Sequence, residues 1–252
     1  MDPLNCENLI KSNERIDQFK REKIQLIQSP DVFNMSADAI LLADFIQLPK
    51  EKSFRYLDFC SGNGVIPLLL SVKTKQKLYG VELQEALVDM AQRSVKLNQL
   101  EGQVEIFQGD INQLKLCDWR ELDYISCNPP YFLVENSTQV HQKTLHAIAR
   151  HEIYLTLEQW VSQASRMLKT KGKLFIVHRP DRLDDLTEML LNYKFSLNRI
   201  KFVYPKLNMN ANIVLIEAIK HGGRRGVKIE PPLVVHRDDN SYTDQMIAVY
   251  YG

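Results

Sequence analysis

Four consecutive residues, Asn128-Pro129-Pro130-Tyr131, combine an amide, two prolines and an aromatic ring directly after the apolar run Leu122–Cys127. The apolar run predicts a buried strand that delivers these four residues at its carboxyl end. Prolines have no N–H to donate and restrict the residues before them, so the turn holds a defined set of acceptors. Fixed acceptors suit an NH2 group, which indicates methylation of a planar, poorly nucleophilic nitrogen.

An exocyclic amine on adenine delocalises its lone pair into the ring, so it attacks a methyl donor slowly. Acceptors on both N–H bonds weaken that delocalisation. We expect the Asn128 side-chain oxygen and the Pro129 carbonyl to hold the two hydrogens, while Tyr131 stacks on the base and aligns the nitrogen with the methyl group. Pro130 and Phe132, the neighbours of Tyr131 in sequence, are also expected to contact the substrate. The plainer interpretation is a turn followed by a packing aromatic, since Asn-Pro often begins turns.

A second group of candidate residues follows three earlier predicted strands. Asp58 heads a turn in which Gly62 and Gly64 allow backbone to approach a ligand. Glu82 ends the next strand, where an acid accepts hydrogen bonds from ribose hydroxyls. Asp110 follows the third strand and is placed to accept from an adenine amino group. A helix cap or loop role is the simpler interpretation of any one of these acids. Three acids at the ends of successive strands, however, suit a ligand that carries an amine, a ribose and an adenine.

S-adenosylmethionine carries all three groups and is the expected cofactor, with Ser61, Ile111 and Asn128 completing its site. A dinucleotide is disfavoured because pyrophosphate needs cationic or amide-rich surroundings, whereas Asp58 heads this loop and only two of three fingerprint glycines are present. No metal is needed, because a sulfonium is already activated.

Alternating strands and helices are expected to position these residues. Strands are predicted over 54–59, 77–81, 104–107, 122–127 and 173–178, and helices over 64–72, 84–97 and 157–168. This succession implies a mainly parallel sheet with helices on both faces. A further helix over 182–192 and apolar runs over 195–204 and 212–219 predict an antiparallel hairpin that ends a seven-stranded sheet.

Two segments are expected to flank the site. Residues 1–50 are interpreted as an N-terminal extension, a lid or substrate-facing segment, with a helix over 37–48 capped by Ser36; residues 51–252 form the main domain. The polar segment 135–153, which contains three histidines, is a candidate mobile loop over the site.

Composition sets outer bounds. The chain has 252 residues, 44% of them hydrophobic, which is ample for a sizeable core. Its 32 basic and 31 acidic residues leave a net charge of +1, so nucleic-acid binding requires a local patch. The four cysteines form no CxxC pair or zinc-like spacing with histidines, so reduced thiols and no metal are expected. Without a signal-peptide pattern or a membrane-span-length apolar run, a soluble, cytoplasmic protein is expected, and a monomer, since no oligomeric partner is indicated.

From about residue 31 to residue 232, the sequence resembles class I S-adenosylmethionine-dependent N-methyltransferases that carry the Asn-Pro-Pro-Tyr motif. More narrowly, it looks like the tRNA(Val) adenine-N6 methyltransferase family in the following segments: 33–39, 58–64, 82–84, 128–132, 149–152 and 178–180. The resemblance implies a Rossmann-like class I methyltransferase fold and N6-methylation of an adenine beside the anticodon of tRNA, at position 37. Asp58, Gly62, Glu82 and Asp110 would then bind the cofactor, and Asn128, Pro129 and Tyr131 the target amine. One departure is Cys60, which stands where many such enzymes have glycine.

Candidate RNA contacts are three cationic segments: 20–23, 178–182 with Arg179, and the glycine-rich loop 221–228 with Arg224 and Arg225. A solvated loop without a ligand is an equally plain interpretation of the last.

Three other functions stay open. Methylation of a protein glutamine amide uses a similarly flat group, but no separate helical docking domain is visible. DNA adenine methylation is disfavoured because no second domain for duplex reading is visible. A non-catalytic RNA-binding module of the same fold is the third, and the cofactor acids and Asn128 speak against it.

Overall fold

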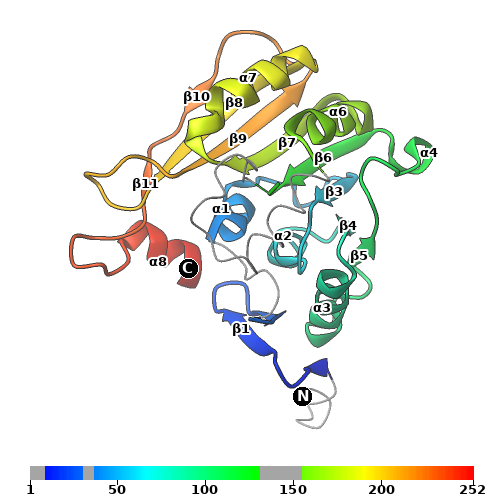
Figure 1. Ribbon diagram of the computed structural model, residues 1–252, viewed down its shortest axis with the longest axis vertical. Coiled ribbons are helices and arrows are strands. Elements are labelled where there is room, and N and C mark those ends of the chain that lie inside the picture. The colour runs from blue at the N-terminus through cyan, green and yellow to red at the C-terminus, as the bar shows by residue number, and fades with distance from the viewer. Residues whose placement is uncertain (1–8, 31–36, 131–154) are drawn as a thin grey trace, which may run out of the picture.

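The computed structural model describes residues 9–30, 37–130 and 155–252 (Figure 1). Its centre is a nine-stranded sheet in which strands are ordered β10-β8-β9-β7-β6-β3-β4-β5, with β11 also paired to β8. The strands are β3 (Tyr56–Phe59), β4 (Leu78–Glu82), β5 (Val104–Gln108), β6 (Leu122–Cys127), β7 (Leu168–His178), β8 (Phe195–Tyr204), β9 (Ile213–Lys220), β10 (Lys228–Ile229) and β11 (Leu233–Val234). Neighbouring strands are parallel except for β9, which runs antiparallel to β7 and β8.

Helices cover both faces of the sheet (Figure 1). One face packs against α1 (Ala37–Phe45), α2 (Val65–Leu70), α3 (Glu85–Leu97) and α8 (Asp244–Tyr251). The other packs against α4 (Leu116–Trp119), α6 (Leu157–Met167) and α7 (Leu183–Asn192), which follows the short 3₁₀ helix η4 (Pro180–Arg182). Because both faces are covered, β3 is buried at all four positions and shows no polar alternation. The predicted parallel α/β sheet is confirmed.

Element boundaries are close to those predicted, with exceptions that have local causes. The first predicted helix ends at Phe45 rather than 48. Strand β7 begins at Leu168 rather than 173, because α6 ends at Met167 and Leu168 already pairs with Leu122 ahead of a register shift. The predicted cap Ser36 and the loop 135–153 lie outside the described residues.

The prediction that the hairpin β8–β9 ends a seven-stranded sheet is wrong in one respect. The antiparallel hairpin is present, but β10 and β11 pair in parallel with the outer side of β8 and raise the strand number to nine. Each has two residues, which is too short to show a hydrophobic period. They cover backbone groups that an edge strand would leave unpaired.

The N-terminal segment contains a hairpin that periodicity did not predict, made of β1 (Arg15–Phe19) and β2 (Ile24–Gln28). Backbone groups of β2 bond to α3: Gln25 N donates to Asn98 Oδ1 at 2.8 Å and Ile27 N to Ser94 Oγ at 3.0 Å. Leu26 and most of α1 belong to the hydrophobic cluster that covers the sheet. The role of residues 1–50 as a lid or substrate-facing extension stays a prediction.

None of the helices in the described part of the chain is long and apolar enough to cross a membrane.

Candidate active site at the carboxyl edge of the sheet

Strand register brings most predicted site residues to one edge of the sheet. Phe59 at the end of β3 is the partner of Cys127 on one side and of Val81 on the other. Glu82 in turn pairs with Gln108 at the end of β5. With strands about 4.8 Å apart, the residues that follow these strand ends lie side by side, in the order Asn128, the glycine turn, Glu82 and Asp110.

The glycine turn after β3 is built on left-handed backbone. Gly62 has φ of +57° and Gly64 of +80°. A Cβ at Gly64 would lie 3.2 Å from Ala91 Cβ, so this glycine lets the turn pack on α3, whereas a Cβ at Gly62 would meet nothing within 4 Å. Gly62 is therefore the position at which a ligand can approach the backbone. Cys60 also has positive φ, +53°, a conformation that glycine adopts without strain.

Glu82 ties the turn to the next helix. It is buried, its Oε2 accepts from Gly62 N at 2.9 Å, and its Oε1 accepts from Gln84 N at 3.0 Å. A carboxylate offers about four acceptor positions, so this arrangement orients Glu82 and leaves acceptor capacity for ribose hydroxyls.

Asp110 orders its own turn. Its Oδ1 accepts from Asn112 N at 2.8 Å and its Oδ2 from Gln113 Nε2 at 3.1 Å. Ile111 beside it is buried. The loop role and the predicted adenine-binding role are compatible, because the half-buried carboxylate keeps free lone pairs.

Asp58 is fully buried beneath the glycine turn. Its Oδ1 accepts from the Ser126 hydroxyl, which also bonds to the Tyr56 hydroxyl at 2.5 Å. Burial raises the pKa of Asp58 to about 7, while the Ser126 and Ser61 hydroxyls act in the opposite direction. Sequence reasoning missed Ser126, for which the only signal was a hydroxyl in an apolar strand.

The buried polar atoms beneath the glycine turn fit the expected cofactor. Asp58 Oδ2 and Ser61 Oγ are buried side-chain atoms without a hydrogen bond of good geometry to any described residue. Leaving such atoms unsatisfied is costly. A ligand amine above the turn is the kind of donor that the Asp58 carboxyl lacks.

The Asn-Pro-Pro segment begins directly beside this turn. Cys127 is fully buried, Asn128 and Pro130 are half-buried, and Pro129 is buried. Burial, together with the neighbouring Cys60, raises the pKa of the Cys127 thiol. Tyr131 and Phe132 lie outside the described residues, so their stacking and substrate roles stay predictions.

The candidate RNA contacts divide between two edges. His178 ends β7 two residues beyond the partner of Cys127, and burial lowers its pKa to about 4, so it is neutral and not a surface cation. Arg179 is exposed at the same edge, with Nε 3.2 Å from Asp181 Oδ2. Arg224 and Arg225 follow the antiparallel strand β9, so they lie at the opposite, amino-terminal edge.

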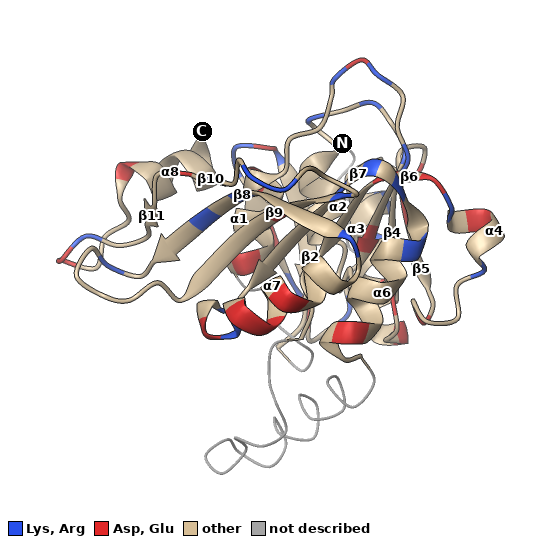
Figure 2. Cartoon of the chain, turned by 90° about the horizontal axis from the view of Figure 1, so that it is seen from above, with Lys and Arg blue, Asp and Glu red and all other residues tan. Residues whose placement is uncertain are grey.

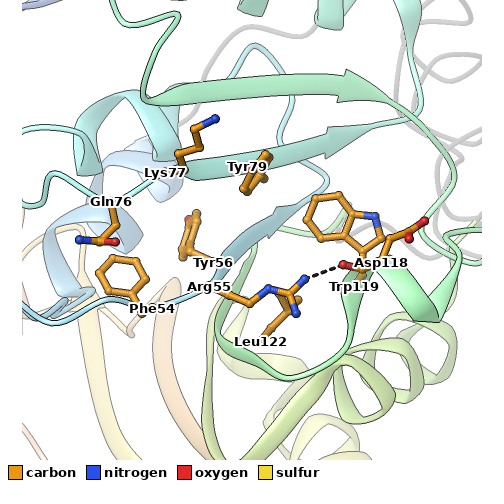
Figure 3. Close-up of a pocket in the computed structure, with 9 residues that line it drawn as sticks. All are labelled: Phe54, Arg55, Tyr56, Gln76, Lys77, Tyr79, Asp118, Trp119 and Leu122. Atoms are coloured by element: carbon orange, nitrogen blue, oxygen red, sulfur yellow. Dashed lines mark hydrogen bonds between the residues drawn. The ribbon is translucent and has the colours of Figure 1, made fainter.

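A cavity of about 410 Å³ also lies at the amino-terminal edge, where β3, β4 and β6 begin (Figure 3). Aromatic rings of Phe54, Tyr79 and Trp119 line it, and the Arg55 guanidinium at its rim donates to the Asp118 carbonyl at 2.5 Å. It contains none of the predicted cofactor or catalytic residues. Among the described residues, no group of three or more His, Cys, Asp or Glu side chains is arranged to hold a metal ion.

Comparison with known proteins identifies the fold and the family. The tRNA1(Val) (adenine(37)-N6)-methyltransferase of Porphyromonas gingivalis is 26% identical over 190 residues, covering 73% of each chain. The protein of the same name from Tolumonas auensis is 25% identical over 237 residues, covering 92% of this chain and 94% of its own. The crystal structure of a predicted O-methyltransferase from Agrobacterium tumefaciens has a TM-score of 0.63 at 20% identity, covering 84% of this chain and 95% of that one, and shares the Rossmann-like fold. Residues 23–200, well over half of the chain, match the methyltransferase small domain, and the chain therefore belongs to that family.

Proposed function

We propose that this protein transfers a methyl group from S-adenosylmethionine to N6 of an adenine in tRNA, beside the anticodon at position 37. The family and the names of the relatives from Porphyromonas and Tolumonas support methyl transfer to this substrate. The observation that carries the proposal is the order of residues along the carboxyl edge. Asn128 adjoins the glycine turn, followed by Glu82 and Asp110, which matches a methyl donor lying along the edge with its reactive end toward Asn128.

Bound S-adenosylmethionine supplies an activated methyl group. The chain's own contribution is to hold the acceptor nitrogen. The Asn128 side-chain oxygen and the Pro129 carbonyl accept from the two amine hydrogens, which returns electron density to the nitrogen. Burial of Cys127 and Pro129 fixes the start of this segment, so these acceptors need no reorganisation during the reaction.

The Asn128→Ala variant tests the assigned chemistry. We expect methyl transfer to unmodified tRNA to fall by roughly 10²- to 10³-fold, the usual cost of removing one preorganised hydrogen-bonding group. Binding of the cofactor, measured by calorimetry, should stay nearly unchanged, because Asn128 is only one of several expected cofactor contacts. Asp110→Ala is the reciprocal control, because it should weaken cofactor binding. Equal turnover by the wild type and Asn128→Ala would remove Asn128 from the mechanism.

Mass spectrometry of nucleosides tests the substrate. Bulk tRNA from a strain lacking this protein should have less N6-methyladenosine than tRNA from its parent, and the plasmid-borne gene should restore it. An unchanged level would rule out tRNA adenine and direct attention to the glutamine amide of a protein substrate.

A further inference from the structure

Three segments at the amino-terminal edge of the sheet meet and carry exposed cations. They are the first part of β7 (residues 169–172), the turn 193–194 and the loop 221–228, whose last residue begins β10. His221 N donates to Lys194 O at 2.8 Å, and Lys171 Nζ donates to His221 O at 3.3 Å, so the three segments are bonded to one another. We call their exposed cations the cationic turn cluster: Lys171, Lys194, Arg224, Arg225 and Lys228.

The positive charge of this cluster is not neutralised within the described chain. None of its members forms an ion pair there, and three acids on or next to the neighbouring strands pair with other cations: Glu217 with Lys173 and Arg199, Glu230 with Arg199, and Asp123 with Lys169. Burial and then the charge of Lys194 lower the pKa of Lys220, which reflects the same local field. Figure 2 shows Lys and Arg along the loop beside β10, whereas Asp and Glu lie on α6 and α7. With a net charge of only +1 for the whole chain, this is a local concentration.

The shape of the loop 221–228 favours contact with a phosphate over contact with a planar base. Arg225 and Gly226 have positive φ, +85° and +98°, and a Cβ at Gly223 or Gly226 would meet nothing within 4 Å. The backbone is thus open to a ligand, and the loop carries Arg and Lys side chains but no Phe, Tyr or Trp. Exposed Lys and Arg side chains contact backbone phosphates, and such contacts position a nucleic acid without reading its sequence.

The cluster is remote from the proposed reaction. Lys171 precedes His178 by seven positions along β7, which corresponds to roughly 23 Å at about 3.3 Å per residue. The nucleotide whose base reaches Asn128 therefore does not reach the cluster. A folded RNA extends for several such lengths and contacts both edges by running along the side of the domain.

We propose that the cationic turn cluster binds the phosphate backbone of the RNA substrate outside the loop that contains the target base. This inference rests on the proposed function, since it assigns a second contact to the same substrate.

The test compares full-length unmodified tRNA with its isolated anticodon stem-loop, using Arg224→Ala/Arg225→Ala. Fluorescence anisotropy at several salt concentrations gives the Kd and its salt dependence. We expect the Kd for full-length tRNA to rise roughly tenfold, and the slope of log affinity against log salt to become shallower by about 1 for each phosphate that the variant no longer neutralises. Binding and methylation of the stem-loop should not change.

Two controls isolate the charge at these positions. Arg224→Lys/Arg225→Lys keeps the charge and should bind full-length tRNA within about twofold of the wild type. Lys96→Ala/Lys115→Ala removes two exposed cations elsewhere and should change the Kd little. All variants should have the melting temperature of the wild type, because the replaced side chains are exposed.

An unchanged Kd and salt slope for full-length tRNA would overturn the inference, and so would an equal loss of binding for the stem-loop. If the wild-type protein methylates neither RNA, the proposed function fails, whereas the binding measurements still decide the role of the cluster.

Discussion

At the residue scale, Asp58 has the most unusual environment in the site. Its carboxyl group is fully buried, one oxygen accepts from Ser126, and the other has no partner of good geometry among the described residues. Burial outweighs the hydroxyls and raises its pKa from 3.8 to about 7, with a further contribution from Glu82. The protonation of Asp58 therefore changes near neutral pH, and folding is coupled to it.

Replacing Asp58 with asparagine should alter the pH dependence of stability. Between about pH 4 and pH 7 the folded state binds a proton that the unfolded state releases, so the free energy of unfolding falls as pH rises through this range. The loss is on the order of a few kcal/mol and is complete above the folded pKa. Asp58→Asn should flatten the wild-type decline in melting temperature from pH 5 to pH 8.

The same thermal scans on Glu101→Gln, an exposed turn position, should retain the wild-type slope. A wild-type slope in Asp58→Asn would show that Asp58 titrates in the folded protein as it does in the unfolded chain.

Spacing was enough to predict that Asp58, Glu82 and Asp110 follow successive strand ends, because parallel strands bring their carboxyl ends to one edge. It was not enough to predict the burial of Asp58, which depends on Ser126 from a strand distant in sequence. Position 60 has a φ of +53°, a conformation that glycine adopts without strain and that costs cysteine energy, so the structure gives a reason for glycine here and none for Cys60.

At the element scale, the approach of β4 to the glycine turn sets the position of Ser61. A Cβ on Gly80 would clash with Ser61 Oγ and would lie 2.9 Å from Ser61 Cβ and 2.6 Å from Ile106 Cδ1. Ser61 N also donates to Val81 O at 3.0 Å, so the turn is held directly against β4. A side chain at position 80 cannot be accommodated without displacing the turn.

Gly80→Ala should therefore affect both stability and cofactor binding. Overpacking of this kind costs about 1–3 kcal/mol, and displacement of Ser61 should weaken cofactor affinity measured by calorimetry. Gly102→Ala is the matched control, since a Cβ there meets nothing within 4 Å; its stability should stay within about 0.5 kcal/mol of the wild type. Equal behaviour of the two variants would mean that β4 does not restrain the turn.

Helices and strands with a clear sequence pattern were predictable, whereas those that depend on tertiary contacts were not. β6 and β8 have the predicted bounds because apolar and aromatic residues recur along the whole length of each. Strand β1 is largely polar and charged, and its partner β2 is held by hydrogen bonds to α3 that sequence periodicity does not encode. The position of Arg224 and Arg225 depended on the direction of β9, because an antiparallel strand carries its following loop to the opposite edge.

At the scale of the whole molecule, the first and last described segments pack together on one face of the sheet. Arg21 Nη1 donates to Ala248 O at 3.2 Å, and Lys20 Nζ lies 5.4 Å from the centre of the Tyr251 ring. Met246 of α8 is fully buried in the cluster that contains α1 and α2. The C-terminal helix is thus part of the core that supports the glycine turn.

Two adjacent residues of α8 test whether this helix stabilises the whole domain. Met246→Ala removes a fully buried side chain and should cost about 2–5 kcal/mol, which lowers the melting temperature by roughly 5–15 °C for a chain of this size. Ile247→Ala removes a side chain that is 39% exposed and should shift the melting temperature by no more than about 2 °C. Saturating S-adenosylmethionine should raise the melting temperature of both variants by a similar amount, because ligand binding to the folded state adds a term that depends on its Kd. A separate low-temperature transition in Met246→Ala, with the ligand-dependent transition unchanged, would mean that α8 unfolds independently and does not support the site.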